Sequence, residues 1–569
     1  MARSLPISTG TVIIGNGPAA LILSYILHGN IPHYIPSPPH PDTLLHKKLV
    51  ESSDLLHLDI RRLTQHFEAS PFSYSTQALP VNVLLDTLIR PNGDTCDLEE
   101  ATNIVWEYQP EQAAPHIVIG NTTSPGGQWV DNPVQASWDI GTLSYAGMLS
   151  LPGYPFAEHY RRTTGKELPP YTRPSRRQVT DYFRHYPHQV RIDDAVYCGE
   201  TVSGITRTAD GFHIKSHDIS CKHLVLASGV FSELIPAPPL LQPLLRLPGP
   251  SAQPSSPDIP LLVVGSGFSA ADVISSSPPG QKIIHIYRWA PSTSPSPLRA
   301  CHQQAYPEYA GLYRRMKQAA KITSNPLGLE SSRPKVQRAS TSAFDSSRDW
   351  SSKYEGFPNT TITDVKVEGE TALITLQAAD GGPTLQHRIS RLEYVVGRRG
   401  SLRYLSRELR REVFGSNSNS SRDSADPEPA EQMLSGQTLR DKVLEDIEVA
   451  PDVFAIGSLT GDSLIRFAHG SCTYAAGKIM APSRRHGKEE NVEQPQMANG
   501  KEENIEQPQM ANGVGKIDHE DAGSRLSRVV SGAKNATAVP ATKIMSGLDG
   551  HHRPCINANN LGSLGESPR

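Results

Sequence analysis

Two glycine-rich turns of the same design lie 250 residues apart in this chain. Each follows a strand-like apolar run, "TVII" or "LLVV", and each leads into a helical stretch. The small residues are Gly15, Gly17 and Ala20 in the first turn, and Gly265, Gly267 and Ala270 in the second. The first glycine makes the sharp bend, the second lets backbone approach a diphosphate, and the third residue lets helix and strand pack closely. Because the helix N-terminus also favours an anion, the sequence predicts two dinucleotide sites.

The end of the second strand in each unit indicates which dinucleotide binds, because it contacts the adenosine ribose about 20 residues after the glycines. In the second unit Arg288 ends "IIHIYR", 21 residues after Gly267. A cation there suits a ribose 2′-phosphate and favours NADP over NAD; the alternative is a solvated arginine at a strand end. In the first unit the expected carboxylate is missing, since "HYIPSPPHPD" offers Pro36 and Ser37, and Asp42 lies too far along.

The elements that must position these turns alternate between strands and helices. Up to about residue 245, strand-like "TVIIG", "HIVIGN" and "HLVLASG" alternate with helical stretches such as "RRQVTDYFRHY". After a Pro/Ser-rich connector, "LLVVGSGFSA" and "KIIHIYRW" begin a second unit, and "TTITDVKVEGETALITLQ" predicts a hairpin. "LEYVVG" and "DVFAIG" predict further strands before a last helix in "SLIRFAHGSCTYAAGKIM". This alternation predicts an α/β fold with largely parallel sheets.

Composition narrows the classes of function. The 55 basic and 58 acidic residues give a net charge of −3, which favours neither nucleic acid nor an anionic membrane surface as partner. Apolar runs of about 18 residues, long enough to span a membrane, are missing from the sequence. Six cysteines without a CxxC pair or metal-ligand spacing indicate reduced thiols in a cytoplasmic protein with no redox-active dithiol and no metal site.

The segment after residue 483 differs from everything before it. "GKEENVEQPQMANG" is repeated as "GKEENIEQPQMANG" with a period of 13 residues. A polar unit of that length cannot bury a core, so we expect a disordered tail over residues 483–569, with a role in interactions as the alternative to none.

Taken together, these motifs resemble those of known protein families. The two turns, "GGQW" and "LVLASG" resemble flavin-dependent monooxygenases with two dinucleotide-binding domains. More narrowly, "VIIGNGPAALILSYIL", "LPVNVLLDTLIRP", "MLSLPGYPFAEHY", "RPSRRQVTDYFRHY", "YPEYAGLYRRMK" and "VFAIGSLTGDSLIRFAHG" are similar to the oxidative stress-induced growth inhibitor family. The resemblance implies two Rossmann-like domains: an FAD domain made of residues 1–245 and 394–482, and an inserted NADPH domain, 246–393, that carries the Ser-rich insert.

The same resemblance implies roles for individual residues. Those implied to contact FAD are Gly15, Gly17, Ala20, Gly126, Gly127, Gln128, Trp129, Gly229 and Gly457. Those implied to contact NADPH are Gly265, Gly267, Ser269, Ala270 and Arg288. Trp129 would pack near the flavin ring, with an ordinary core position as the alternative. Ser458 stands where related flavoproteins often have aspartate, and Asp462 is a possible substitute for it.

Other polar residues carry no catalytic pattern. Arg173, Arg176 and Arg177 in "RPSRR" could bind phosphate or substrate, although a solvated helix start is favoured. For His469, at the start of the last helix, a structural role is favoured. The FxGxxxHxxxW fingerprint of many related monooxygenases is absent from the connector, and "YVVGRR" departs from the usual FATGY-like strand.

The function expected from the resemblance is that of an oxidoreductase whose hard chemistry belongs to its cofactors. NADPH would reduce FAD, O₂ would add at flavin C4a, and the resulting hydroperoxide would pass one oxygen atom to a small organic substrate. Two alternatives use the same residues: an NADPH oxidase or flavin reductase that releases peroxide, and a regulatory flavoprotein without efficient turnover.

Overall fold

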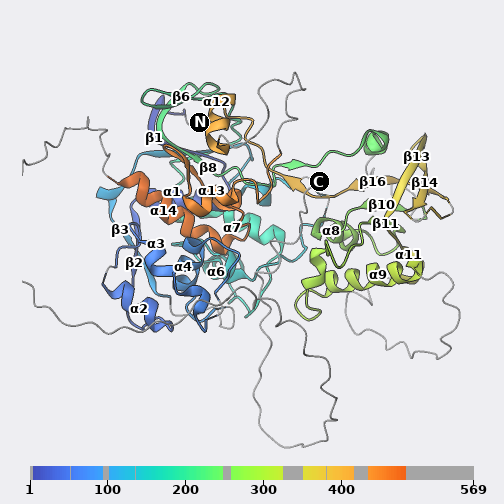
Figure 1. Ribbon diagram of the computed structural model, residues 1–569, viewed down its shortest axis with the longest axis horizontal. Coiled ribbons are helices and arrows are strands. Elements are labelled where there is room, and N and C mark those ends of the chain that lie inside the picture. The colour runs from blue at the N-terminus through green and yellow to red at the C-terminus, as the bar shows by residue number, and fades with distance from the viewer. Residues whose placement is uncertain are drawn as a thin grey trace, which may run out of the picture. The chain divides into compact units, whose positions relative to one another are not determined.

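The computed structural model describes residues 4–51, 53–72, 74–93, 102–132, 134, 136–247, 258–324, 350–379, 381–382, 384–415 and 433–481 (Figure 1). The described residues all belong to one compact unit. The predicted tail with its tandem repeat, nearly all of the Ser-rich insert and the Ser/Asn/Asp-rich insert lie outside the described residues. In the part of the chain that the structure describes, no helix has the length and apolar character needed to cross a membrane.

The first sheet is built around the first glycine turn. Its central strand, β1, lies between β4 and β8 and runs parallel to both. Along the sheet the order is β18-β19-β8-β1-β4-β5, with the β6–β7 hairpin joined through β7 to β8. The strands are β1 (Ser8–Ile14), β4 (His116–Gly120), β5 (Val196–Cys198), β6 (Ile205–Thr208), β7 (Gly211–Ile214), β8 (Ile219–Leu226), β18 (Glu448–Ala450) and β19 (Val453–Ala455). The segments predicted as strands from "TVIIG", "HIVIGN", "HLVLASG" and "DVFAIG" are thereby confirmed.

The helices beside this sheet come from both ends of the described chain. α1 (Pro18–Leu27) begins with a proline, whose fixed φ suits a first helical turn, and its residues 20–27 are all buried. It packs against α14 (Ala468–Met480), which also contacts α4 (Pro80–Ile89) (Figure 1). The predicted helix in "RRQVTDYFRHY" is α7 (Arg176–Gln189), which starts at a capping box formed by Ser175 and Gln178.

The residues between α1 and β4 form a long excursion from the first sheet. β2 (Asn30–Tyr34) and β3 (Ile104–Tyr108) form their own antiparallel pair, and neither joins the first sheet. Helices α2 (Thr43–Val50), α3 (Ile60–Thr64) and α4 lie between them in the chain. The strand that follows α1 therefore does not return to the side of β1, and β4 takes that place.

The second sheet, of order β12-β11-β10-β16, is parallel throughout and surrounds the second glycine turn. α8 (Phe268–Ser276) and α9 (Pro307–Ser324) share one apolar cluster with its strands, and a separate antiparallel sheet packs in another. The strands are β10 (Leu261–Val264), β11 (Ile283–Tyr287), β12 (Tyr354–Pro358) and β16 (Arg391–Tyr394), with the predicted hairpin as β13 (Thr360–Glu368) and β14 (Thr371–Ala378), joined by β15 (Leu385–Ile389).

Short elements complete the described fold. β9 (Glu233–Leu234) and β17 (Arg398–Arg399) pair antiparallel where the chain leaves the first sheet and returns to it. The remaining helices are α5 (Ala146–Leu149), α6 (Phe156–Thr164), α11 (Trp350–Lys353), α12 (Arg407–Phe414) and α13 (Arg440–Glu445).

A buried ion pair joins the excursion to the C-terminal segment. Asp86 of α4 accepts hydrogen bonds from Arg466 Nε and Nη2, at 3.0 and 2.5 Å, and also pairs with Arg90. Asp86 and Arg466 are 7% and 6% exposed. Since removing one partner leaves an uncompensated buried charge, we expect Asp86→Ala to lower the free energy of unfolding by about 3–5 kcal/mol. Urea denaturation tests this, with Glu51→Ala, in an exposed pair with Arg62, as the control expected to cost no more than about 1 kcal/mol.

Candidate functional site

The first glycine turn, between β1 and α1, is closed on one side and open on the other. Gly15 has φ +114°, and its amide donates to the Ile119 carbonyl of β4 at 2.7 Å. A Cβ on Gly15 would lie 2.5 Å from the Ala227 carbonyl oxygen, so this position requires glycine. Gly17 has φ −78°, and a Cβ there would meet no atom within 4 Å. The turn is therefore pressed against β8 at its first glycine and leaves free space at its second.

The second turn, between β10 and α8, repeats this construction. Gly265 has φ +150°, its amide donates to the Ile286 carbonyl of β11 at 3.0 Å, and a Cβ would lie 2.4 Å from the Val395 carbonyl oxygen. At Gly267 a Cβ would meet only Pro297 Cγ, at 3.9 Å. The two turns thus have the same backbone environment, as their shared spacing predicts.

This repetition identifies the second strand of the first unit. Ile119 accepts from the first turn as Ile286 does from the second, so β4 is the counterpart of β11, and Asn121 is the counterpart of Arg288. The expectation that "HYIPSPPHPD" ends the second strand is therefore wrong, because that segment closes β2, which pairs with β3. Asp42 instead caps α2 and accepts hydrogen bonds from His66 and Tyr74.

A cavity of about 480 Å³ lies against the first turn, at the carboxyl ends of β1, β4, β5 and β8. Eight of the residues implied to contact FAD or to substitute in that site line it: Gly15, Gly17, Gly127, Gln128, Trp129, Gly229, Gly457 and Asp462. Ala20 and Gly126 do not line it. Ala20 is fully buried in α1, where its small side chain permits close packing. The structure therefore brings together segments that are far apart in the chain.

The "GGQW" segment lies directly on the first turn. The Gly126 amide donates to the Asn16 carbonyl at 2.9 Å, and a Cβ on Gly127 would lie 3.1 Å from Gly17 Cα. Trp129 lines the cavity and also packs edge-on against Phe183, with ring centroids 6.1 Å apart. Trp129 is therefore both a cavity residue and part of the core.

The opposite wall comes from the ends of β8 and β19. Ser458 Oγ accepts a hydrogen bond from the Val230 amide at 3.1 Å, so it ties the two strand ends together. The Asp462 carboxylate accepts from the Leu79 amide at 2.8 Å, Asn82 Nδ2 at 2.6 Å and Arg440 Nη1 at 2.9 Å. Burial raises the pKa of Asp462. Asp462 thus reaches the cavity, but its oxygens already hold α4 and α13 in place.

The three arginines of "RPSRR" have different environments. Arg177 is exposed beside Asp139, as expected of a solvated helix start. That expectation is wrong for the other two. Arg173 forms an ion pair with Glu308 at 2.8 Å. Arg176 is only 8% exposed, and its Nε donates a hydrogen bond to the Trp129 carbonyl oxygen at 3.3 Å. Burial lowers the pKa of Arg176. Through this hydrogen bond, Arg176 therefore stabilises the backbone of the "GGQW" segment.

The residues implied to contact NADPH lie in two places: Gly265, Gly267, Ser269 and Ala270 lie between the end of β10 and the first turn of α8, and Arg288 directly follows β11. Ala270 is buried within α8, Ser269 beside it is half-buried, and Arg288 is exposed. Arg288 makes no hydrogen bond or ion pair within the ranges that the structure describes. Asp272, further along α8, accepts a hydrogen bond from Tyr309 at 2.8 Å, and burial raises its pKa to about 6.

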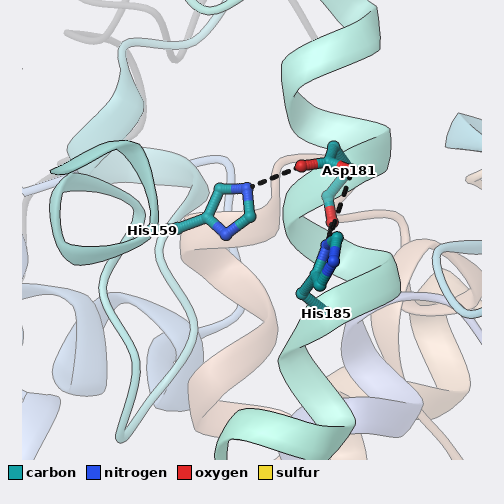
Figure 2. A group of neighbouring side chains, drawn as sticks. All are labelled: His159, Asp181 and His185. Atoms are coloured by element: carbon teal, nitrogen blue, oxygen red, sulfur yellow. Dashed lines mark hydrogen bonds and ion pairs between the residues drawn. The ribbon is translucent and has the colours of Figure 1, made fainter. Parts of the chain in front are cut away.

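A separate polar group joins α6 to α7 (Figure 2). His159 Nε2 lies 3.1 Å from Asp181 Oδ2, and His185 Nδ1 lies 3.5 Å from Asp181 Oδ1. The three ligand atoms lie within 4.8 Å of one another and are of types that could hold a divalent metal. His185 Nδ1 is also 2.8 Å from the Asp181 carbonyl oxygen, one helical turn back. None of the three lines the 480 Å³ cavity, so the group stands apart from the glycine turns.

Two fully buried histidines give the folded chain an acid sensitivity. Burial lowers the pKa of both His285, in β11, and His469, in α14, from 6.5 to about 4. His469 does not line the cavity, in line with the structural role favoured from the sequence. Because the unfolded chain binds these protons first, stability is lost as the pH falls from about 6.5 toward 4, by up to about 3 kcal/mol for each histidine. Urea midpoints measured between pH 7.5 and 4.5 test this, and His469→Gln is expected to make the pH dependence shallower.

Several cavity residues give little sequence signal. Glu200 follows β5 at the edge of the cavity, its amide donates to the Gly120 carbonyl at 3.0 Å, and its carboxylate lies 3.2 Å from His217 Nε2. Asn16 Nδ2 donates to the Thr122 carbonyl at 3.3 Å. Glu200 follows β5, and β5 pairs with β4, the strand that takes the place of β2 beside β1. Glu200 could therefore be singled out only by knowing that β4 and β5 are neighbours in the sheet.

The fold is α/β, with two sheets that each place a glycine-rich turn between a strand and a helix, an arrangement typical of dinucleotide-binding folds. The chain is similar in sequence to oxidative stress-induced growth inhibitors. It is 24% identical over 512 residues to mouse oxidative stress-induced growth inhibitor 1, covering 83% of this chain and 95% of that one. It is 26% identical to human oxidative stress-induced growth inhibitor 2, covering 56% and 70%. A homologue from Caenorhabditis elegans is 30% identical over 36% of this chain and 41% of its own length. No family model matches the chain.

Solved structures with a related arrangement include two kinds of enzyme. A flavin-containing monooxygenase from Stenotrophomonas maltophilia aligns with a TM-score of 0.42 at 13% identity, covering 83% of this chain and 98% of that chain. Bacillithiol disulfide reductase from Staphylococcus aureus aligns with a TM-score of 0.41 at 10% identity, with the same coverage.

Proposed function

We propose that this chain is an FAD-dependent, NADPH-consuming monooxygenase that transfers one oxygen atom from O₂ to a small organic substrate. The observation that supports this most directly is the repeated turn: two glycine positions, Gly17 and Gly267, leave space where a diphosphate would approach the backbone. The first of them opens into a cavity of about 480 Å³, within the range of small-molecule and cofactor sites.

The residues present fit FAD in the first site. The backbone from Gly15 to Gly17 and the N-terminus of α1 would bind its diphosphate, and Glu200 would accept hydrogen bonds from its ribose. Trp129 would exclude water on one side of the cavity, and Arg176 would hold the Trp129 backbone in place. When bound, FAD supplies the redox and oxygen chemistry, and the protein supplies orientation and a dry enclosure.

Among the described residues, no thiol pair lies at the cavity for an alternative, disulfide-based reaction. The described cysteines, at positions 198, 221, 301 and 472, are all free, and none lines the cavity. Cys198 Sγ contacts Asn16 Nδ2 at 3.4 Å, and burial raises the pKa of its thiol. Within the described part of the chain, electrons from NADPH therefore have no protein dithiol to reach beside the first turn.

The test is a sequence of measurements on the purified full-length chain. A bound flavin spectrum that bleaches with anaerobic NADPH would establish the reductive half of the reaction. Oxygen is then admitted with a panel of amines, sulfides and ketones, and oxygenated product and hydrogen peroxide are compared with the NADPH consumed. Product matched to NADPH supports the monooxygenase. Peroxide matched to NADPH with every substrate indicates the oxidase, and no bleaching indicates a regulatory flavoprotein.

A further inference from the structure

The His–Asp–His group, made of His159, Asp181 and His185, brings three possible metal ligands together from two helices (Figure 2). His159 lies on α6, whereas Asp181 and His185 lie one helical turn apart on one face of α7. The Asp181 carboxylate lies between the two rings, with Oδ2 3.1 Å from His159 Nε2 and Oδ1 3.5 Å from His185 Nδ1. Because His159 joins the other two only in the folded chain, spacing in the sequence does not reveal the group.

The distances within this group suit a metal ion. Zinc binds imidazole nitrogen and carboxylate oxygen in tetrahedral geometry at about 2.0–2.2 Å, which separates neighbouring ligand atoms by about 3.4 Å. The two contacts to Asp181 already have nearly that separation, and the three ligand atoms all lie within 4.8 Å of one another. To coordinate, His185 Nδ1 must give up its 2.8 Å hydrogen bond to the Asp181 carbonyl oxygen. About half of the His185 side chain is exposed to solvent, which leaves room for that rotation.

The surroundings of His159 hold its ring in place on the dry side of the group. His159 is buried, and the rings of Tyr154, Phe156 and Tyr182 lie around it with centroids 5.9, 6.1 and 5.5 Å from its own. Its second nitrogen, Nδ1, lies 3.4 Å from the Tyr154 hydroxyl, a partner of the kind that orients a metal-bound imidazole. The α7 side of the group is partly open to solvent, so an ion can enter from that side.

The types of ligand atom select the ion. Two imidazoles and one carboxylate suit Zn²⁺ and its neighbours in the first transition row, whereas Mg²⁺ and Ca²⁺ prefer oxygen ligands. The described cysteines are not part of the group, so its ligands are nitrogen and oxygen only. Three protein ligands leave the fourth tetrahedral position to a water molecule.

We propose that the His–Asp–His group binds one Zn²⁺ ion, with water as the fourth ligand, and that the ion links α6 to α7. The same helix α7 also contacts the "GGQW" segment: Thr180 Oγ1 donates to the Trp129 carbonyl at 2.8 Å, and Phe183 packs edge-on against the Trp129 ring. The ion therefore fixes a helix that supports the wall of the 480 Å³ cavity. The inference is independent of the proposed function, because it requires neither flavin nor NADPH.

The experiment titrates Co²⁺, a spectroscopic probe of zinc sites, into the full-length chain after treatment with a chelator. We expect one equivalent to bind with the visible absorption of a tetrahedral nitrogen and oxygen site, and Zn²⁺, but not Mg²⁺ or Ca²⁺, to displace it. Asp181→Asn and His185→Gln should each weaken binding at least about 100-fold, because loss of a residue that only supports a ligand already costs about 10–100-fold. His213→Gln, in a surface pair with Asp218, is the matched control and should bind the ion as the parent chain does.

Three results would overturn the assignment. The first is a parent chain that takes up no Co²⁺. The second is a thiolate-to-cobalt charge-transfer band, which would place the ion on cysteines. The third is unchanged binding in both Asp181→Asn and His185→Gln; its loss in His551→Gln/His552→Gln would then place the ion on these adjacent histidines, which lie outside the described residues. Thermal midpoints without metal show whether each variant folds, and Zn²⁺ should raise the midpoint of the parent chain but not that of Asp181→Asn.

Discussion

Replacing Gly17 with valine is expected to abolish flavin binding while the chain still folds. A Cβ at this position meets no protein atom within 4 Å, and its φ of −78° suits any residue, so a side chain can begin here without strain in the backbone. The valine side chain would instead fill the space where the diphosphate approaches the amides of the turn. We expect an affinity for FAD at least about 100-fold lower, equivalent to about 2.7 kcal/mol. Flavin content after purification and FAD titration of the stripped protein measure this.

The neighbouring glycine provides the contrast. Gly15→Ala places a methyl group 2.5 Å from the Ala227 carbonyl oxygen at φ +114°, so it should disturb the sheet itself and lower the thermal midpoint. Gly17→Val should keep the parent thermal midpoint measured without FAD. Retention of full flavin affinity by a well-folded Gly17→Val chain would contradict a diphosphate site at this turn, whatever reaction the protein performs.

The strand–turn–helix units could be predicted from the sequence because their determinants are local. "TVII" and "LLVV" are apolar runs of strand length, and the GxGxxA spacing after each has one steric explanation. The close approach of the first glycine to a third strand follows from the same geometry, and the structure shows it twice, at Ala227 and at Val395. The α/β fold class follows from such units, since parallel strands need helical crossovers.

Features that depend on contacts distant in sequence could not be predicted in this way. β2 has the length and position of a second Rossmann strand, yet it pairs with β3, and the choice between β2 and β4 as neighbour of β1 is made by tertiary pairing. The search for a ribose carboxylate after β2 therefore missed Glu200. Arg176 gives the local signal of a solvated helix start, and only the fold buries it behind Trp129.

Gly267→Val tests whether the second turn serves a separate nucleotide. A Cβ there would meet only Pro297 Cγ, at an ordinary contact distance of 3.9 Å, and its extended backbone accepts a side chain without strain. The variant should therefore fold and keep the parent affinity for FAD, but bind NADPH at least about 100-fold more weakly, or about 2.7 kcal/mol. Anaerobic reduction of its flavin by NADPH should slow accordingly at subsaturating nucleotide, whereas reduction by dithionite should not change.

Measured together, the two valine variants distinguish two separate cofactor sites from one shared site, which neither variant does alone. If the two turns hold two cofactors, Gly17→Val removes flavin and leaves NADPH binding, and Gly267→Val does the reverse. A single ligand shared by both turns would make each substitution weaken the same binding constant. Because a Cβ at either glycine would meet at most one protein atom within 4 Å, and that one at 3.9 Å, unequal folding damage does not account for a reciprocal result. Reciprocal loss would therefore show that each set of backbone amides binds its own diphosphate, which is the condition for bringing an electron donor to an acceptor within one chain.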